Sequence, residues 1–147
     1  MNLTLLGNKV EGWKSPHDAI LETISIPEMP YKYSVRMTCP EFTSNCPKTG
    51  QPDFACIVID YIPNRQLIES KALKLFMASF RNHADFHEAC TCYIAARLLS
   101  VLEPTWLRVA AFWYPRGGIP LDVFWQSKEP PAGVYVHPLD IPAYRGR

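Results

Sequence analysis

Alternation of apolar and polar residues predicts a strand over residues 31–39. Odd-numbered positions in this stretch are apolar and even-numbered positions are polar, which is typical of a strand with one buried face. Residues 54–62 are mostly β-branched and apolar, and they predict a second strand. Residues 106–114 and 121–125 predict two more strands, and the proline- and glycine-containing turn at 115–118 between them predicts a hairpin.

Two helices are predicted in the window 64–103, which contains neither proline nor glycine. In the first helix apolar residues recur at i, i+3, i+4 and i+7 from Leu73 to Phe80. The second helix is expected to begin near Asp85, with Glu88 in the spacing of a capping box, and to end before Pro104. The order strand, strand, helix, helix, strand, strand is typical of an α+β domain with an antiparallel sheet.

Composition favours a globular protein with one hydrophobic core. The chain has 147 residues, of which 48% are hydrophobic and 20% charged, so it is long enough to bury a core without disulfides. We expect a single domain over 1–147, with residues 1–25 and 128–147 as peripheral arms and a proline-rich loop after Glu129. No internal repeat interrupts this pattern.

Charge and cysteine usage narrow the class of protein. The 15 Lys+Arg and 14 Asp+Glu give a net charge of +1, unlike the strongly basic balance of a dedicated nucleic-acid-binding surface. No apolar run is long enough to span a membrane, and the N-terminus does not resemble a signal peptide. The five cysteines follow no disulfide spacing, so we expect free thiols and a cytoplasmic protein.

Cys46 is the strongest candidate for chemistry. It is expected in a loop rich in proline and glycine between the first two strands, where a core thiol has little reason to be. A loop thiol near an ionisable partner is a candidate nucleophile, and Asp53 lies seven residues further on. The alternative is that Cys46 is an incidental loop residue and Asp53 a turn former. The local sequence leaves both interpretations open.

The remaining cysteines and histidines do not predict a metal site. Cys39 and Cys56 fall within strand patterns and are interpreted as small core residues, while Cys90 and Cys92 point in different directions on a helix. His83 and His87 are four residues apart, but no CxxC pair accompanies them. We therefore expect no metal.

Several charged residues have two interpretations each. Glu88 either caps its helix or accepts from the paired N–H donors of a guanine-type base. Lys71 and Lys74 share a helix face that either is solvated, which their spacing favours, or binds phosphate. Arg116, beside two glycines in a turn, is a second candidate phosphate contact. No glycine-rich nucleotide-binding loop is present, so any nucleotide must be held by another device.

Four segments, in order, closely resemble the single-domain 7-cyano-7-deazaguanine reductases, also called QueF nitrile oxidoreductases. They are 41–55 (EFTSNCPKTGQPDFA), 69–76 (ESKALKLF), 80–88 (FRNHADFHE) and 115–119 (PRGGI). The chain departs from the family pattern after the paired glycines, where Pro120 removes a backbone donor.

The resemblance implies a fold and an assembly. The family has the α+β tunnelling fold, with order ββααββ and a four-stranded antiparallel sheet carrying two helices. Members of this size assemble as rings, commonly a decamer of two stacked pentamers, with active sites between subunits. We therefore expect a homo-oligomer.

The resemblance also implies an activity. It is the NADPH-dependent reduction of the nitrile of 7-cyano-7-deazaguanine to 7-aminomethyl-7-deazaguanine, for queuosine in tRNA. The partner implied is a small deazapurine, with no direct contact to nucleic acid or membrane.

Residue roles follow from the matched positions. Cys46 is matched to the nucleophile that forms a covalent thioimide, and Asp53 to the acid that delivers protons. Lys71 and Lys74 are matched to NADPH binding, with Arg116 as a further cofactor contact. The residues matched to substrate binding are Ile68, Glu69, Ser70, His87 and Glu88.

Three other functions remain as alternatives. The first is a non-reducing, amidinotransferase-like relative, which would lack the Glu-Ser-Lys segment at 69–71. The second is a pterin or purine cyclohydrolase of the same superfamily, which would need zinc. The third is a ligand-binding module without catalysis.

Overall fold

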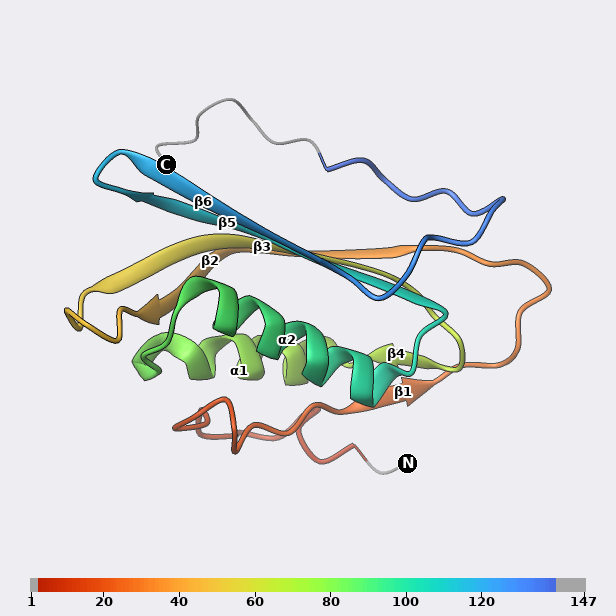
Figure 1. Cartoon of the computed structure of the whole chain (residues 1–147). Coiled ribbons are helices and arrows are strands. Elements are labelled where there is room, and N and C mark those ends of the chain that lie inside the picture. Colours follow the sequence, from red (N-terminus) through yellow and green to blue (C-terminus); the bar gives the residue numbers. More distant parts are fainter. Residues whose placement is uncertain (1–2, 140–147) are drawn as a thin grey trace.

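The structure, a computed structural model, describes residues 3–139 and contains four long strands, two short strands and two α-helices (Figure 1). In chain order the elements are β1 (Thr23–Ser25), β2 (Val35–Asn45), β3 (Pro52–Ile62), β4 (Gln66–Ile68), α1 (Ser70–Ala78), the 3₁₀ helix η1 (Ser79–Asn82), α2 (His87–Leu102), β5 (Trp106–Arg116) and β6 (Ile119–Gln126).

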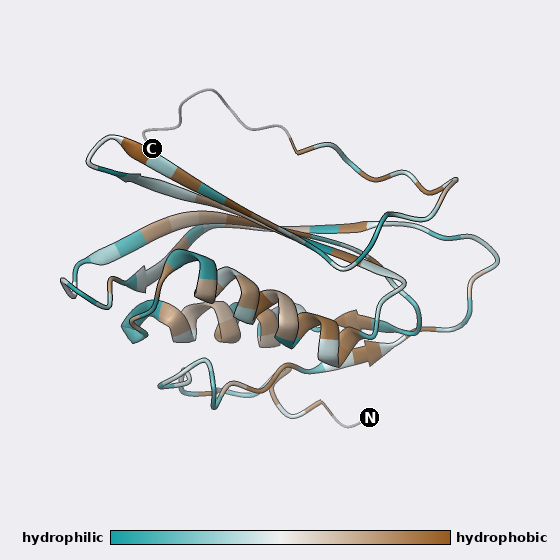
Figure 2. Cartoon of the chain, in the orientation of Figure 1, coloured by the Kyte–Doolittle hydropathy of each residue, from teal (hydrophilic) through white to brown (hydrophobic). Residues whose placement is uncertain are grey.

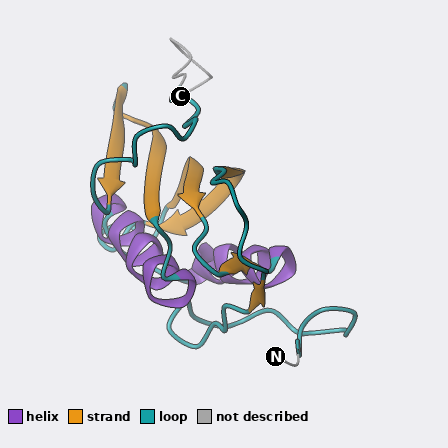
Figure 3. Cartoon of the chain, turned by 90° about the vertical axis from the view of Figure 1, so that its right-hand side faces the viewer, coloured by secondary structure: helices purple, strands orange, loops and turns teal. Residues whose placement is uncertain are grey.

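The four long strands form one antiparallel sheet in the order β2-β3-β5-β6. Both helices lie on one side of it, and the described C-terminal segment crosses the other side, here called the outer face (Figures 1 and 3). The predicted α+β arrangement of strands and helices is therefore confirmed.

The core lies between the sheet and the helices. Alternate residues of β3 from Ala55 to Tyr61 point toward the helices and are buried. The helical stripe from Leu73 to Phe80 is buried against them, as its spacing predicts. Figure 2 shows the apolar residues recurring along the helices and the central strands.

Strand β2 runs further than its sequence pattern predicts. It begins at Val35 and continues through Pro40 to Asn45, instead of ending at Cys39. The pairing with β3 shifts between Cys39 and Phe42, so Pro40 falls in an irregularity where its missing N–H breaks no regular ladder bond. The prediction of a loop from residue 40 onward was wrong, and the loop that holds Cys46 is shorter than expected.

The predicted capping box at the start of α2 is also wrong. The helix begins at His87, its N-cap residue is Phe86, and no side chain caps it. Asp85 N donates to Asn45 O at 3.2 Å, and this bond holds the preceding backbone alongside β2 in a short parallel bridge. The helix therefore cannot start at Asp85, and Glu88 is left exposed in the first turn.

The N-terminal segment, residues 3–25, packs against the rest of the chain. Strand β1 pairs with β4, a small two-stranded sheet that the sequence patterns do not predict. Leu5, Ala19 and Leu21 are buried. The Glu22 carboxylate accepts from Thr4, whose hydroxyl bond lowers the pKa of that carboxyl. Residues 3–25 therefore form part of the layer beside the helices (Figure 1).

The described part of the C-terminal tail is a loop, and β5 and β6 form a hairpin, as the sequence predicts. Residues 127–139 contain no helix or strand, and 140–147 lie outside the described residues. The hairpin turns at Gly117 and Gly118, which both have positive φ angles, 57° and 81°. Pro120 lies on β6, an edge strand, where its missing donor is tolerated.

Candidate active site

The Cys46 loop is tied closed by its own backbone. Cys46 N donates to Gln51 O at 2.8 Å, and Gly50 N donates to Cys46 O at 2.9 Å. Gly50 has a φ of 68°, a conformation that favours glycine. Asn45 N donates to His83 O at 2.9 Å, which fastens the loop to the junction before α2. The position of the sulfur is therefore set by three segments of the chain.

The surroundings of the Cys46 sulfur favour its ionised form. The Thr49 hydroxyl, the Lys48 and Thr49 amides and the Arg116 guanidinium donate to the sulfur, and they lower the pKa of Cys46 to about 6. At neutral pH most of Cys46 is thiolate. The thiolate is the nucleophilic form of cysteine, so this residue is prepared for covalent chemistry.

Asp53 is a buried carboxylate with an incomplete set of partners. Its side chain is 5% exposed, and one oxygen forms an ion pair with Arg116. The other oxygen, Oδ2, lies 3.2 Å from His87 Nε2. Within residues 3–139 neither of these two buried atoms has a hydrogen-bond partner of good geometry. Such buried polar atoms call for an explanation, and here both residues line a cavity from which a ligand can complete the bonding.

These side chains surround one hollow of about 490 Å³, which we call the Cys46 cavity. Its volume is in the range that suits a small-molecule ligand. It joins the β2–β3 loop, the start of β3, the start of α2 and the β5–β6 hairpin. Its lining residues are Cys46, Pro47, Lys48, Thr49, Asp53, Asp85, Phe86, His87, Glu88, Arg116, Ile119 and Leu121.

Five predicted site residues meet in the Cys46 cavity: Cys46, Asp53, His87, Glu88 and Arg116. The sequence predicts Arg116 as a phosphate contact. In the structure its guanidinium contacts Asp53 and Cys46, the two candidate catalytic residues.

Sequence reasoning missed Thr49 and Phe86. Thr49 carries no strong signal, since a threonine in a turn is common. Phe86 has one, because it directly precedes His87 and is an aromatic residue in a polar stretch. The residue is 57% exposed and lines the cavity, where its ring offers a flat apolar surface.

The predicted substrate residues Ile68, Glu69 and Ser70 lie elsewhere in the chain, at the junction of β4 and α1. The Glu69 carboxylate caps α1, accepting from Lys71 N and Ala72 N at 2.9 Å each. None of the three lines the Cys46 cavity. Within one chain, therefore, this segment does not meet Cys46.

The two predicted NADPH lysines are also apart from the Cys46 cavity. Lys71 Nζ donates to Leu5 O at 2.6 Å and to Asn8 O, so it fastens the N-terminal segment to α1. Lys74 and Arg81 line a separate hollow of about 450 Å³ beside the bulge of β2.

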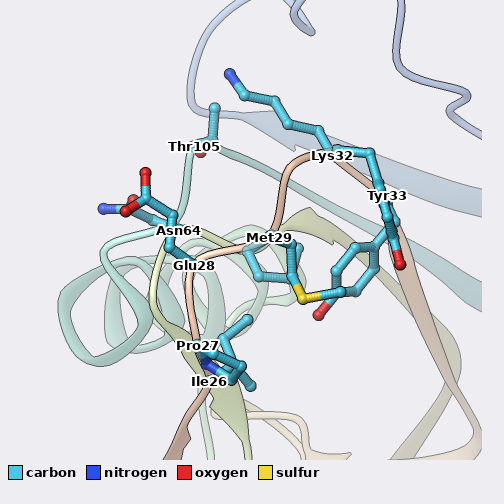
Figure 4. A pocket seen from close by; sticks show the side chains of 10 residues that line it. Ile26, Pro27, Glu28, Met29, Lys32, Tyr33, Asn64 and Thr105 are labelled. Atoms are coloured by element: carbon cyan, nitrogen blue, oxygen red, sulfur yellow. The ribbon is translucent and has the colours of Figure 1, made fainter.

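A third hollow, of about 120 Å³, lies at the far end of the β2–β3 hairpin (Figure 4). Glu28 and Lys32 are its charged lining residues, and no cysteine or histidine lines it. We assign no chemistry to it.

Two of the other thiols, those of Cys39 and Cys90, differ from that of Cys46. Burial raises the pKa of Cys39 and raises that of Cys90 to about 12, so both are held as thiols. Among residues 3–139 no three His, Cys, Asp or Glu side chains are grouped as a metal site. In the same described range no helix is both long and apolar enough to cross a membrane.

The chain is similar to proteins of known activity. A family described as QueF-like protein matches residues 52–132. The NADPH-dependent 7-cyano-7-deazaguanine reductase of Rhizobium etli (strain CIAT 652) is 57% identical over 146 residues, which cover 99% of this chain and 94% of that protein. The protein of the same name from Granulibacter bethesdensis (strain ATCC BAA-1260 / CGDNIH1) is 57% identical over 145 residues, covering 99% and 95%.

A solved structure has a similar fold. The crystal structure of the archaeosine synthase QueF-Like in the apo form matches with a TM-score of 0.60 and 19% identity. The match covers 71% of this chain and 100% of that one. At this identity the likeness concerns the fold, and it confirms the predicted tunnelling fold; ring assembly stays a prediction.

Proposed function

The chain belongs to the QueF-like protein family, and from that premise we propose that it reduces the nitrile of 7-cyano-7-deazaguanine to a primary amine with NADPH. We place the reaction in queuosine biosynthesis, in the cytoplasm. The observation that carries the proposal is the Cys46 cavity, where a thiolate lies beside Asp53 and His87, whose atoms Oδ2 and Nε2 have no hydrogen-bond partner within residues 3–139.

Cys46 begins the reaction by covalent addition. Its thiolate attacks the nitrile carbon and forms a carbon–sulfur bond, while the nitrogen takes one proton from the Asp53–His87 pair. The product is a thioimide, whose C=N bond accepts hydride more readily than a nitrile does. Asp53 Oδ2 and His87 Nε2, 3.2 Å apart, are the two atoms available to pass that proton.

The remaining steps return Cys46 to its starting state. NADPH, when bound, supplies one hydride to the thioimide carbon and a second to the imine carbon after sulfur has left. The nitrogen takes a second proton in the first reduction. The carbon–sulfur bond then breaks, its electron pair returns to sulfur, and the low pKa of Cys46 makes this thiolate a good leaving group. Two hydrides and two protons convert the nitrile to the amine.

The cations of this chain suit the phosphates of NADPH. Lys48 and Arg116 line the Cys46 cavity, and Lys74 lies beside Arg81 at the hollow next to β2. We propose that these four side chains hold the cofactor. Lys71 already binds two backbone carbonyls, so its matched role in NADPH binding stays a prediction.

Substrate recognition involves residues that line the Cys46 cavity and residues of a neighbouring subunit. The exposed Glu88 carboxylate accepts from the paired donors of the deazaguanine, and Phe86 offers a flat face beside it. We propose that Ile68, Glu69 and Ser70 reach the substrate from a neighbouring subunit of a ring, since within one chain they lie apart from Cys46.

The decisive experiment follows NADPH oxidation with 7-cyano-7-deazaguanine. Cys46→Ala should lose turnover, and mass spectrometry should find no substrate adduct on the variant. Cys92→Ala is the matched control, because Cys92 is exposed and outside the Cys46 cavity, and it should keep both. An adduct that persists in Cys46→Ala would show that the nucleophile is another residue. Wild-type protein that binds the nitrile without oxidising NADPH would favour the binding-module alternative.

A further inference from the structure

The ring of His87 rests on a buried tryptophan. The imidazole of His87 and the indole of Trp113 are stacked with centroids 4.1 Å apart and planes 9° from parallel. Trp113 lies on β5 and is fully buried, while His87 lines the Cys46 cavity. Parallel stacking fixes the plane of the imidazole, so the direction in which Nε2 points depends on the indole beneath it.

Thr91 holds this tryptophan in place. Trp113 Nε1 donates to Thr91 Oγ1 at 3.3 Å, and the Thr91 hydroxyl donates its own hydrogen to His87 O at 2.8 Å. Phe42 packs edge-on against the indole, with centroids 5.6 Å apart. The indole is therefore restrained from several sides, and one restraint returns to the backbone of His87 itself.

The direction of His87 matters because one contact depends on it. Nε2 lies 3.2 Å from Asp53 Oδ2, and no other group holds either atom in the described residues. A rotation of the imidazole would separate the two atoms between which the proton passes.

We propose that Trp113 is a positioning residue that, locked by Thr91, holds the His87 ring so that Nε2 stays 3.2 Å from Asp53 Oδ2, within reach for proton delivery to the substrate nitrogen. The inference rests on the proposed function for its kinetic part. Its structural part concerns the orientation of one ring and is measurable without turnover.

The test compares Trp113→Phe with Trp113→Leu. Phenylalanine keeps an aromatic face below His87, and leucine keeps only apolar volume. We expect kcat to fall about tenfold or more in the leucine variant with little change in KM, since proton delivery contributes to rate and not to binding. Phenylalanine should restore most of kcat. Alkylation of Cys46 by iodoacetamide should be unchanged in both variants.

Ring ¹⁵N spectra of His87 supply a readout that does not need activity. The ring ¹⁵N shifts of wild-type protein should report one arrangement of hydrogen on the two ring nitrogens. Those of Trp113→Leu should report an average of arrangements, because the imidazole is no longer held in one position. Trp106→Leu is the matched control, since Trp106 is equally buried on the same strand but donates to Lys128 O, away from His87. It should lower stability and leave the His87 spectrum and kcat per folded molecule unchanged.

The following results would overturn the positioning role of Trp113 or separate it from the proposed function. Equal kcat in Trp113→Leu and wild type, equal losses in the Phe and Leu variants, or an unchanged His87 spectrum would overturn the proposal. If Trp113→Leu does not fold, Thr91→Val replaces the hydroxyl with a methyl group of similar size and should lower kcat severalfold with the same spectral change; no change would overturn the proposal. A wild type without turnover but with the spectral difference would refute the proposed function and keep the positioning role.

Discussion

Strand β3 carries two buried aspartates that are both paired with arginine, yet their surroundings differ. Asp60, on the outer face, has its carboxylate bonded by Arg36 at 2.6 and 3.0 Å and by Arg108 at 3.1 and 2.7 Å. Asp53, seven residues earlier and on the helix-facing side, has one oxygen paired with Arg116 and the other without a hydrogen bond.

The outer-face group of Arg36, Asp60 and Arg108, called here the Asp60 cluster, is structural. Its two arginines also donate to His137 O at 2.8 and 2.7 Å, so they hold the C-terminal segment on the sheet. Near it Leu139 packs on a small apolar group that includes Val58 and Phe112. Both oxygens of the Asp60 carboxylate accept hydrogen bonds from arginine, so neither is left open to a ligand as Oδ2 of Asp53 is.

The comparison teaches how to distinguish the roles of buried charges. Both carboxylates are almost fully buried, 3% and 5% exposed, and so burial alone does not separate them. What separates them is the completeness of their hydrogen bonding and the presence of a cavity beside the open oxygen. Replacing each aspartate in turn with the neutral asparagine therefore tests whether the two carboxylates have different roles.

Asp53→Asn should have the largest effect, and on activity. The amide cannot deliver a proton, so we expect kcat to fall by about 10²–10⁴ with substrate binding largely kept. The free energy of unfolding should change by less than ~1 kcal/mol, because its arginine partner is 45% exposed and solvated. Turnover kinetics and chemical denaturation measure the two quantities. Unchanged kcat would remove Asp53 from the mechanism.

Asp60→Asn should show the opposite pattern. The substitution leaves two arginines without their counter-charge, and breaking a buried ion pair in this way costs about 3–5 kcal/mol of stability. Activity per folded molecule should be unchanged at a temperature where the variant is folded. Denaturant midpoints and kcat for this variant and Asp53→Asn form one matched experiment. Loss of kcat without loss of stability would contradict the assignment of the Asp60 cluster.

Thr49→Val should change the titration of the nucleophile. The Thr49 hydroxyl is the largest influence that lowers the pKa of Cys46 to about 6, so its removal should raise that pKa toward the value of a free thiol. The sign follows because a lost donor destabilises the thiolate and not the thiol. The pH midpoint of Cys46 alkylation, followed by mass spectrometry, measures the change. Thr43→Val is the control, since its hydroxyl donates to Glu41 O.

His137→Ala should have the smallest effect. Both arginines of the Asp60 cluster bond the backbone carbonyl of His137, and the alanine variant keeps that carbonyl. The imidazole adds only exposed contacts, from Nδ1 to Arg36 at 2.9 Å and to Pro138 O at 2.8 Å and from its ring edge-on to Tyr135, so we expect a loss of about 0.5 kcal/mol or less. Thermal unfolding measures it. A loss near that of Asp60→Asn would mean that the side chain, and not the backbone, holds the segment.

The sequence predicts the candidate site unevenly, and for identifiable reasons. Cys46 is detectable because a thiol among turn residues is unusual, and Asp53 because it lies close by in the chain. The pairing of Arg116 with Asp53 is not detectable, because it depends on β3 and β5 being neighbours in the sheet. The stacking of His87 on Trp113 joins α2 to β5 and has no local signal either.

The sequence by itself determines the order of the four long strands and the two α-helices, since burial of one face imposes a period of two or of 3.6 on neighbouring residues. Only the tertiary structure decides where β2 ends and α2 begins, because the bond between Asn45 and Asp85 joins segments forty residues apart. The same holds for the chemistry. A residue's type is written in the chain, but the charge it carries depends on donors that folding brings to it, as Thr49 and Arg116 do for Cys46.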